Sequence, residues 1–242
     1  MINKINPSFF ILLMLFMNLE KNDASDRVVL LSIPSEIWYN RIYLIADKKS
    51  WMDYGNFTVQ IGDRGELVYN FPHWYHGKYD PALYNVDIND DTLEDVIIVL
   101  NNDKAGIGKP LKDIHILNQI QDPYRRYEEA PIEQPNLTMN RLVKIEKHGN
   151  IVNILADKKE YKIDISKYNF TNPRDPSVST DTIEYSIENG TLKGKINAYV
   201  VRDNSVYGGI LGHLIIDYFW DGQMYKAKSK SITFKQDEPE NN

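Results

Sequence analysis

The 242-residue chain contains no cysteine. Its absence excludes disulfides, a thiolate nucleophile, cysteine-based zinc sites and anchoring through an acylated cysteine. Any bound metal must therefore be held by oxygen or imidazole ligands. The chain also lacks basic runs, and its formal net charge is −6 at pH 7. Because phosphate backbones are bound by clustered lysine and arginine, we expect no nucleic-acid partner.

Long apolar runs are scarce. The main one, Phe9 to Met17, is shorter than the ~20 residues that cross a bilayer, so we predict no transmembrane span. It follows a weakly positive start and is typical of the apolar region of a secretory signal, which predicts a signal peptide over residues 1–25. The alternative is a buried N-terminal helix or strand, since no small-x-small cleavage site follows. A disulfide-free exported protein fits a bacterium with a single membrane, so we expect a secreted or extracytoplasmic location.

The residues that are abundant favour β structure. The chain has 16 tyrosines, 42% hydrophobic residues and 26% charged residues, which is a globular composition. Hydrophobic alternation at a period of two predicts a hairpin in "NFTVQIGDRGELVYNF" and a strand from Val96 to Leu100 that is buried on both faces. A three-strand meander is predicted in "RLVKIEKHGNIVNILADKKEYKIDI". Two more hairpins are expected about Asn189-Gly190 and Asp221-Gly222.

Prolines divide the chain into two predicted domains. Pro123, Pro131 and Pro135 prevent a long helix or central strand between the two halves. We predict a mainly β fold, with an antiparallel β domain over residues 26–130 and an antiparallel β-sandwich or partial barrel over 136–235. The tail, 236–242, is expected to be disordered.

The stretch "DINDDTLED", residues 87–95, is here named the acidic loop. Calcium takes six to eight oxygen ligands, and a short loop supplies them best when alternate residues point inward. The predicted donors are the side chains of Asp87, Asn89, Asp91 and Asp95 and the backbone carbonyl of Leu93. An EF-hand would need glutamate where this chain has Ile98, so this loop is not one. The alternative is a solvated acidic turn that holds no ion.

The pattern Asp-x-Asn-x-Asp-x-x-x-Asp followed by Val-Ile-Ile-Val, with Val86 before it, resembles the calcium loop of FG-GAP/VCBS repeats. Those repeats occur in the propellers of integrin α subunits and in many secreted bacterial proteins. The resemblance covers Leu83 to Asn101 and implies that the acidic loop binds Ca²⁺ and ties two strands together. The family usually has glycine where this chain has Thr92, and a β-branched residue resists positive φ. Either the loop turns differently or it binds the ion less tightly.

Other polar residues give weaker signals. His73 and His76 stand among aromatic residues, but side chains three apart on a strand face opposite sides, so an aromatic loop is favoured over a zinc site. Glu128 and Glu129 follow two arginines, which indicates charge compensation rather than a catalytic carboxylate pair. His115 and His213 lie in strand patterns, which favours structural roles.

No Gly-x-Ser-x-Gly nucleophile elbow occurs in the sequence. We therefore expect a calcium-binding module at the cell envelope whose ligand is a cell-wall polymer or a surface protein. The alternative is an extracytoplasmic hydrolase that acts on polysaccharide or peptide and uses the calcium structurally.

Overall fold

The computed structural model describes residues 26–35, 41–104, 110–168, 170, 173–201 and 207–237. The predicted signal peptide, 1–25, lies outside this part of the chain. The fold is mainly β: 68% of the described residues lie in strands and 6% in helices, and the sheets that they form are antiparallel, as in a β-sandwich. The predicted fold class is therefore confirmed. None of the helices in the described segments is both long and apolar enough to cross a membrane.

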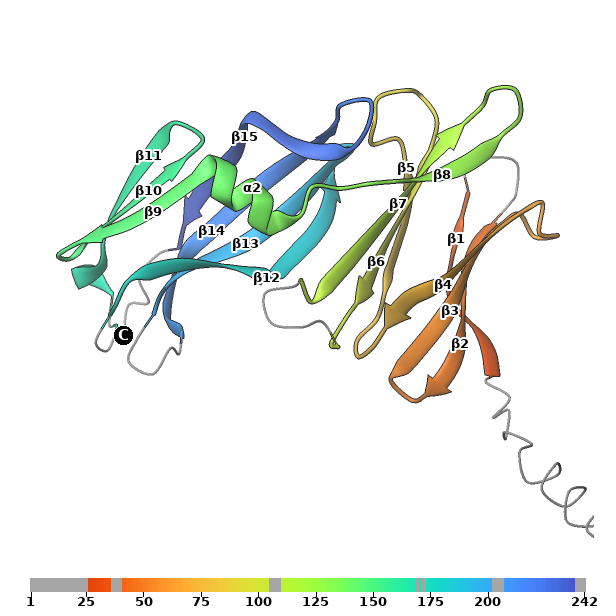
Figure 1. Cartoon of the computed structure of the whole chain (residues 1–242), viewed down its shortest axis with the longest axis horizontal. Helices are drawn as coiled ribbons and strands as arrows, with labels where there is room; N and C mark the ends of the chain where they lie inside the picture. Colours follow the sequence, from red (N-terminus) through yellow and green to blue (C-terminus); the bar gives the residue numbers. More distant parts are fainter. Residues whose placement is uncertain are drawn as a thin grey trace, which may run out of the picture.

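Four sheets follow one another along the molecule (Figure 1). The first sheet contains β1 (Asp26–Pro34), β2 (Arg41–Ser50), β3 (Asp53–Ile61) and β4 (Leu67–His76). The second contains β5 (Ala82–Val86), β6 (Asp95–Asn101), β7 (Lys112–Ile120) and β8 (Arg126–Ala130). The third contains β12 (Pro176–Glu188), β13 (Thr191–Val201), β14 (Tyr207–Trp220) and β15 (Tyr225–Gln236). The fourth contains β9 (Val143–His148), β10 (Ile151–Ala156) and β11 (Lys159–Asp164).

The second sheet is covered on both faces because alternate residues of its strands join different cores. One core, shared with the first sheet, takes Val96, Ile98 and Leu100 of β6 and Leu117 of β7. The other, shared with the third and fourth sheets, takes Ile97 and Val99 of β6 and Ile114 and Ile116 of β7. Every residue of β6 is buried, which confirms the predicted doubly buried run.

The predicted hairpins and meander are confirmed. In the first sheet Phe57 pairs with Phe71 and Val59 with Tyr69, across the "GDRG" turn. The meander is the fourth sheet, β9 to β11. In the third sheet, the β12–β13 turn places Asn189 at φ 52° and Gly190 at φ 73°, the two positive values that a tight hairpin turn requires. The β14–β15 turn contains Gly222 at φ 97°.

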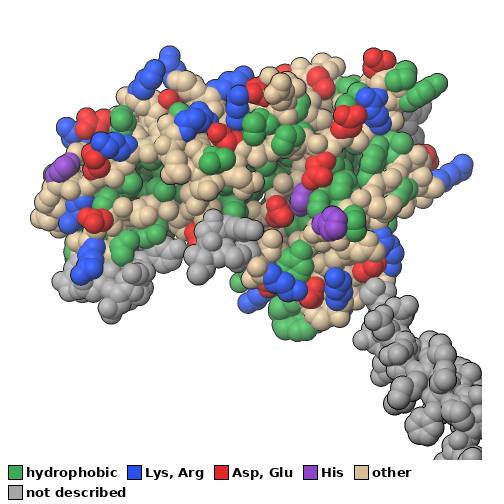
Figure 2. Space-filling model, in the orientation of Figure 1, with side chains coloured by type: hydrophobic (Ala, Val, Ile, Leu, Met, Phe, Trp, Pro, Cys, Tyr) green, Lys and Arg blue, Asp and Glu red, His purple; other side chains and the backbone are tan. Residues whose placement is uncertain are grey.

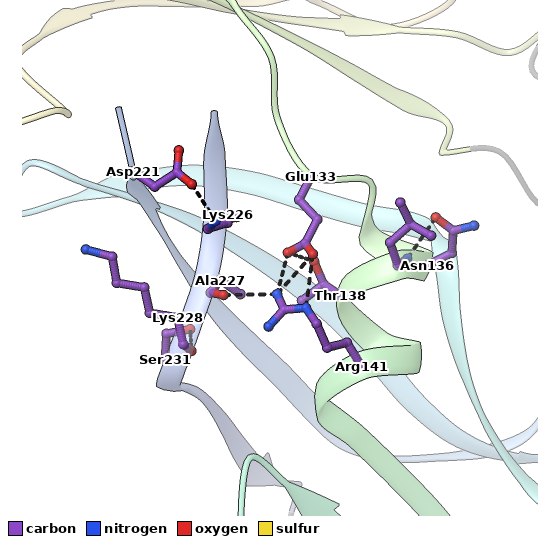
Figure 3. Close-up of polar contacts among 10 residues, drawn as sticks. Glu133, Asn136, Thr138, Arg141, Asp221, Lys226, Ala227, Lys228 and Ser231 are labelled. Carbon is purple, nitrogen blue, oxygen red and sulfur yellow. Dashed lines mark hydrogen bonds and ion pairs between the residues drawn. The ribbon is translucent and has the colours of Figure 1, made fainter. Parts of the chain in front are cut away.

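A helix that the sequence did not predict, α2 (Pro135–Leu142), links the second and fourth sheets. Its first position is proline, which has no N–H to leave unpaired there. Glu133 accepts hydrogen bonds from Arg141, at 2.7 Å, and from the Thr138 hydroxyl, at 2.8 Å (Figure 3). Arg141 also donates to the Ala227 carbonyl of β15, at 3.0 Å. Partial burial acts to raise the pKa of Glu133, but the contacts with Arg141 and Thr138 lower it overall. Because Arg141 bonds both Glu133 and β15, this pair attaches the helix to the third sheet.

The ends of the remaining elements complete the fold. A single 3₁₀ turn, η1 (Ile165–Lys167), follows β11. Strand β15 extends to Gln236, the first residue of the predicted tail, and residues 238–242 lie outside the described part of the chain. On the face drawn in Figure 2, basic and acidic side chains are interspersed rather than separated by sign.

Candidate metal-binding loop and the adjoining cavity

The acidic loop connects β5 to β6, two neighbouring strands of the second sheet. Asp87, the first residue of the loop, accepts hydrogen bonds from three of its backbone N–H groups. One carboxylate oxygen, Oδ1, accepts from the N–H groups of Asn89, at 3.2 Å, and Asp90, at 2.8 Å. The other, Oδ2, accepts from the N–H of Thr92 at 2.8 Å. The Asp87 side chain therefore turns into the loop and not outward into water.

Asn89 and Asp91 continue this arrangement. The side-chain oxygen of Asn89, Oδ1, accepts from the Asp91 N–H at 3.0 Å, and the side-chain nitrogen, Nδ2, donates to Asp91 Oδ2 at 3.1 Å. Asp91 Oδ1 accepts from the N–H of Leu93 at 2.8 Å. Leu93 thus joins the cluster through its N–H, whereas the prediction used its carbonyl. A carboxylate oxygen that accepts one hydrogen bond still has a lone pair, so these contacts leave coordinating capacity.

The loop turns at the position where the sequence departs from the repeat family. Thr92 has a φ of 70°, the left-handed conformation that glycine would adopt there without strain. Asp90 is also left-handed, at φ 63°. A β-branched residue in this region costs on the order of 1–3 kcal/mol. The loop therefore keeps the glycine-like turn, and reduced affinity for an ion stays a prediction.

Asp95, the first residue of β6, has no exposed surface. Its Oδ2 accepts from the Ile88 N–H at 3.2 Å and its Oδ1 from the Gln119 N–H at 3.0 Å. Burial, reinforced by the negative charges of Asp91 and Asp87, raises the pKa of Asp95 to about 7 despite those two amides. Within the described part of the chain, no lysine, arginine or histidine forms an ion pair with Asp95.

The loop side chains are brought together only in part. Asp87, Asn89 and Asp91 are joined through the loop amides, and Asp95 is near enough for two of their charges to act on its pKa. Over the described ranges, no group of three or more histidine or acidic side chains surrounds a common point. What the arrangement provides is a buried carboxylate with two further carboxylates close to it and no basic partner.

A cavity of about 420 Å³, here named the loop cavity, opens beside the acidic loop. Four separate segments form its wall, so no local pattern in the sequence marked it. They are Asn89 and Asp91 of the loop, Asn118, Gln119 and Ile120 of β7, Glu128 to Pro131 at β8, and Trp220, Gly222 and Gln223 at the β14–β15 turn. The buried Tyr225 hydroxyl donates to Asn118 Oδ1 at 2.8 Å, which ties the second sheet to the third behind this wall.

His73 and His76 do not form a metal site. They lie on strand β4 and not in a loop; His73 is exposed, and His76 is 1% exposed. The His76 Nδ1 accepts from the Asn101 N–H at 3.0 Å, and its Nε2 lies 2.8 Å from the Tyr79 carbonyl. Burial lowers the pKa of His76, which fits a neutral, structural imidazole.

His115 and His213 also have structural partners. His115 Nδ1 lies 2.9 Å from Glu129 Oε1, and the ring stacks on Trp74 with centroids 3.7 Å apart. His213 contacts Asn197 at 2.8 Å and Asp237 at 3.2 Å. Two further cavities, of about 320 and 280 Å³, share Lys112 and Tyr185. None of these three cavities has a histidine in its wall.

Comparison of the chain with protein-family models, curated proteins and solved structures finds no match. The likeness of the acidic loop to FG-GAP/VCBS repeats therefore stays a prediction from the sequence.

Proposed function

We propose that this is an exported binding protein of the cell envelope in which the acidic loop holds Ca²⁺. The observation that carries the proposal is Asp95, a fully buried carboxylate whose pKa is raised by burial and by the negative charges of Asp91 and Asp87. A buried carboxylate is unfavourable unless a charge of opposite sign compensates it. A hard divalent cation would supply that compensation, and carboxylate and amide oxygens are the ligands it prefers.

The ligands in this proposal are the side chains of Asp87, Asn89, Asp91 and Asp95 and the Leu93 carbonyl. Bound calcium would connect the end of β5 to the start of β6 and would stabilise only the folded form. At a free calcium concentration 100 times the dissociation constant, this linkage adds about 2.7 kcal/mol to the free energy of unfolding. The role of the ion is therefore to fix the loop and, with it, the adjoining wall of the loop cavity.

Binding is favoured over chemistry by the cavities. A hydrolase of the kind considered above would place a histidine with carboxylates in a pocket. The histidine nearest this arrangement, His115, contacts Glu129 but does not line the loop cavity. The hydrolase alternative gains no specific observation in the described part of the chain.

The proposal is tested by thermal unfolding of the mature protein in excess EGTA and in millimolar calcium. We expect calcium to raise the melting temperature, and we expect Asp91→Asn to reduce that rise. Asp90→Asn is the matched control, because it removes the same charge from the same loop at a left-handed position that asparagine tolerates. Equal melting temperatures in EGTA and calcium, or an equal response of both variants, would contradict the calcium site.

A further inference from the structure

We infer that the loop cavity binds a saccharide segment, with the acidic loop forming part of its wall. This inference rests on the proposed binding function and names its ligand class. A volume of about 420 Å³ lies within the range of small-molecule sites, which is ~300–1,000 Å³. The hydrogen-bonding groups of the wall indicate which ligands fit it.

The acidic groups of the wall can accept hydrogen bonds from a ligand. Asp91, Glu128 and Glu129 carry carboxylates, and the wall contains no lysine, arginine or histidine. Glu128 forms an ion pair with Arg126, at 2.9 Å, and Glu129 Oε1 lies 2.9 Å from His115 Nδ1. These carboxylates accept hydrogen bonds and donate none.

Asn118 provides a hydrogen-bond donor instead. It is 7% exposed, and its Oδ1 is occupied by the Tyr225 hydroxyl. Its amide nitrogen has no hydrogen-bond partner among the residues that the structure describes, and it belongs to a side chain that lines the cavity. This nitrogen is therefore available to donate to an acceptor that a ligand brings into the cavity.

A ligand that uses both kinds of group donates and accepts within one small space. A simple ammonium ion only donates, so it would satisfy the carboxylates and leave Asn118 unpaired. A hydroxyl does both, and a saccharide carries several in fixed positions. Trp220 adds a partly buried aromatic surface against which the apolar face of a sugar ring can pack.

The cavity and the acidic loop share two residues, Asn89 and Asp91. Calcium that binds these side chains would lower the negative charge of the wall and fix the positions of its oxygens. Saccharide affinity should therefore depend on calcium.

The test is isothermal titration of the mature protein with cellotetraose and with chitotetraose, in calcium and in EGTA. We expect at least one of the two to bind in calcium and to lose affinity in EGTA. Asn118→Asp keeps the acceptor for Tyr225 and replaces the free donor with an acceptor, so affinity should fall about tenfold. Asn150→Asp, an exposed substitution in the β9–β10 turn, adds the same charge outside the cavity and should leave affinity unchanged.

A second variant protects the test against misfolding of Asn118→Asp. Gln223 lines the cavity from an exposed turn, so Gln223→Ala should fold normally and weaken saccharide binding.

Failure of both saccharides to bind would overturn the inference, as would binding of spermidine that Asn118→Asp strengthens. Calcium melting curves on the same samples separate the two proposals: a calcium response without saccharide binding overturns only the cavity ligand. Saccharide binding that is unchanged in EGTA would contradict the role of the loop.

Discussion

Replacing Asp95 with asparagine removes the only acidic side chain that is buried in the described part of the chain. The pKa of this carboxyl is 3.8 in its ordinary state and about 7 in the folded protein. As pH rises above about 4, the unfolded chain releases the proton while the folded chain keeps it, so stability falls until pH 7. The full penalty above pH 7 is about 4 kcal/mol. Below pH 4 the penalty is absent.

Asparagine resembles the protonated carboxyl and does not titrate. In EGTA, the free energy of unfolding of Asp95→Asn relative to the original protein should therefore rise by about 3 kcal/mol between pH 4 and pH 7. Tyr127 and Tyr225 also sense the Asp95 charge, and because burial raises the pKa of each, they stay neutral across this window. Urea unfolding of both proteins at matched pH values measures the difference.

Calcium should reverse the order of stability of the two proteins. The ion requires ionised Asp95, so its affinity for the original protein should weaken about tenfold per pH unit below pH 7. At pH 7.5, calcium should stabilise the original protein and leave Asp95→Asn nearly unaffected. Parallel pH profiles of the two proteins in EGTA would refute the assignment of the raised pKa to Asp95.

Two further predictions concern the loop and the core. Thr92→Gly should be more stable than Thr92→Ala by about 1–2 kcal/mol in chemical unfolding, because both lack the side chain and only glycine adopts a φ of 70° without strain; equal stabilities would contradict a left-handed position 92. Ile97→Ala should lower the free energy of unfolding by about 2–5 kcal/mol, since Ile97 is fully buried, whereas Leu155→Ala, at a side chain 40% exposed, should cost far less. Similar losses in both variants would count against a second sheet buried on both faces.

Local signals in the sequence predicted the hairpins because a few residues determine each turn. Asn189-Gly190 and the glycine of Asp221-Gly222 take the positive φ values expected of asparagine and glycine in such turns. The doubly buried strand was predictable from its unbroken apolar run. Helix α2 was not, because its proline-rich surroundings signal a break and its contacts with β15 are far away in sequence.

The sequence predicted which residues form the candidate site but not which of them are buried. The spacing of oxygen donors identified the acidic loop, but nothing in "DINDDTLED" distinguishes the buried Asp95 from the exposed Asp90. That difference arises because β6 begins at Asp95 and is packed between two other layers. The loop cavity could not be predicted either, since its wall joins residues more than a hundred positions apart, from Asn89 to Gln223.

The position of the second sheet between two cores limits how the polypeptide can be dissected. A fragment ending at Ala130 would keep the first two sheets but would leave Ile97, Val99, Ile114 and Ile116 facing water. Exposed apolar area of that kind promotes self-association. We therefore expect such a fragment to form oligomers or aggregates in size-exclusion chromatography, and expression studies should retain the chain through β15.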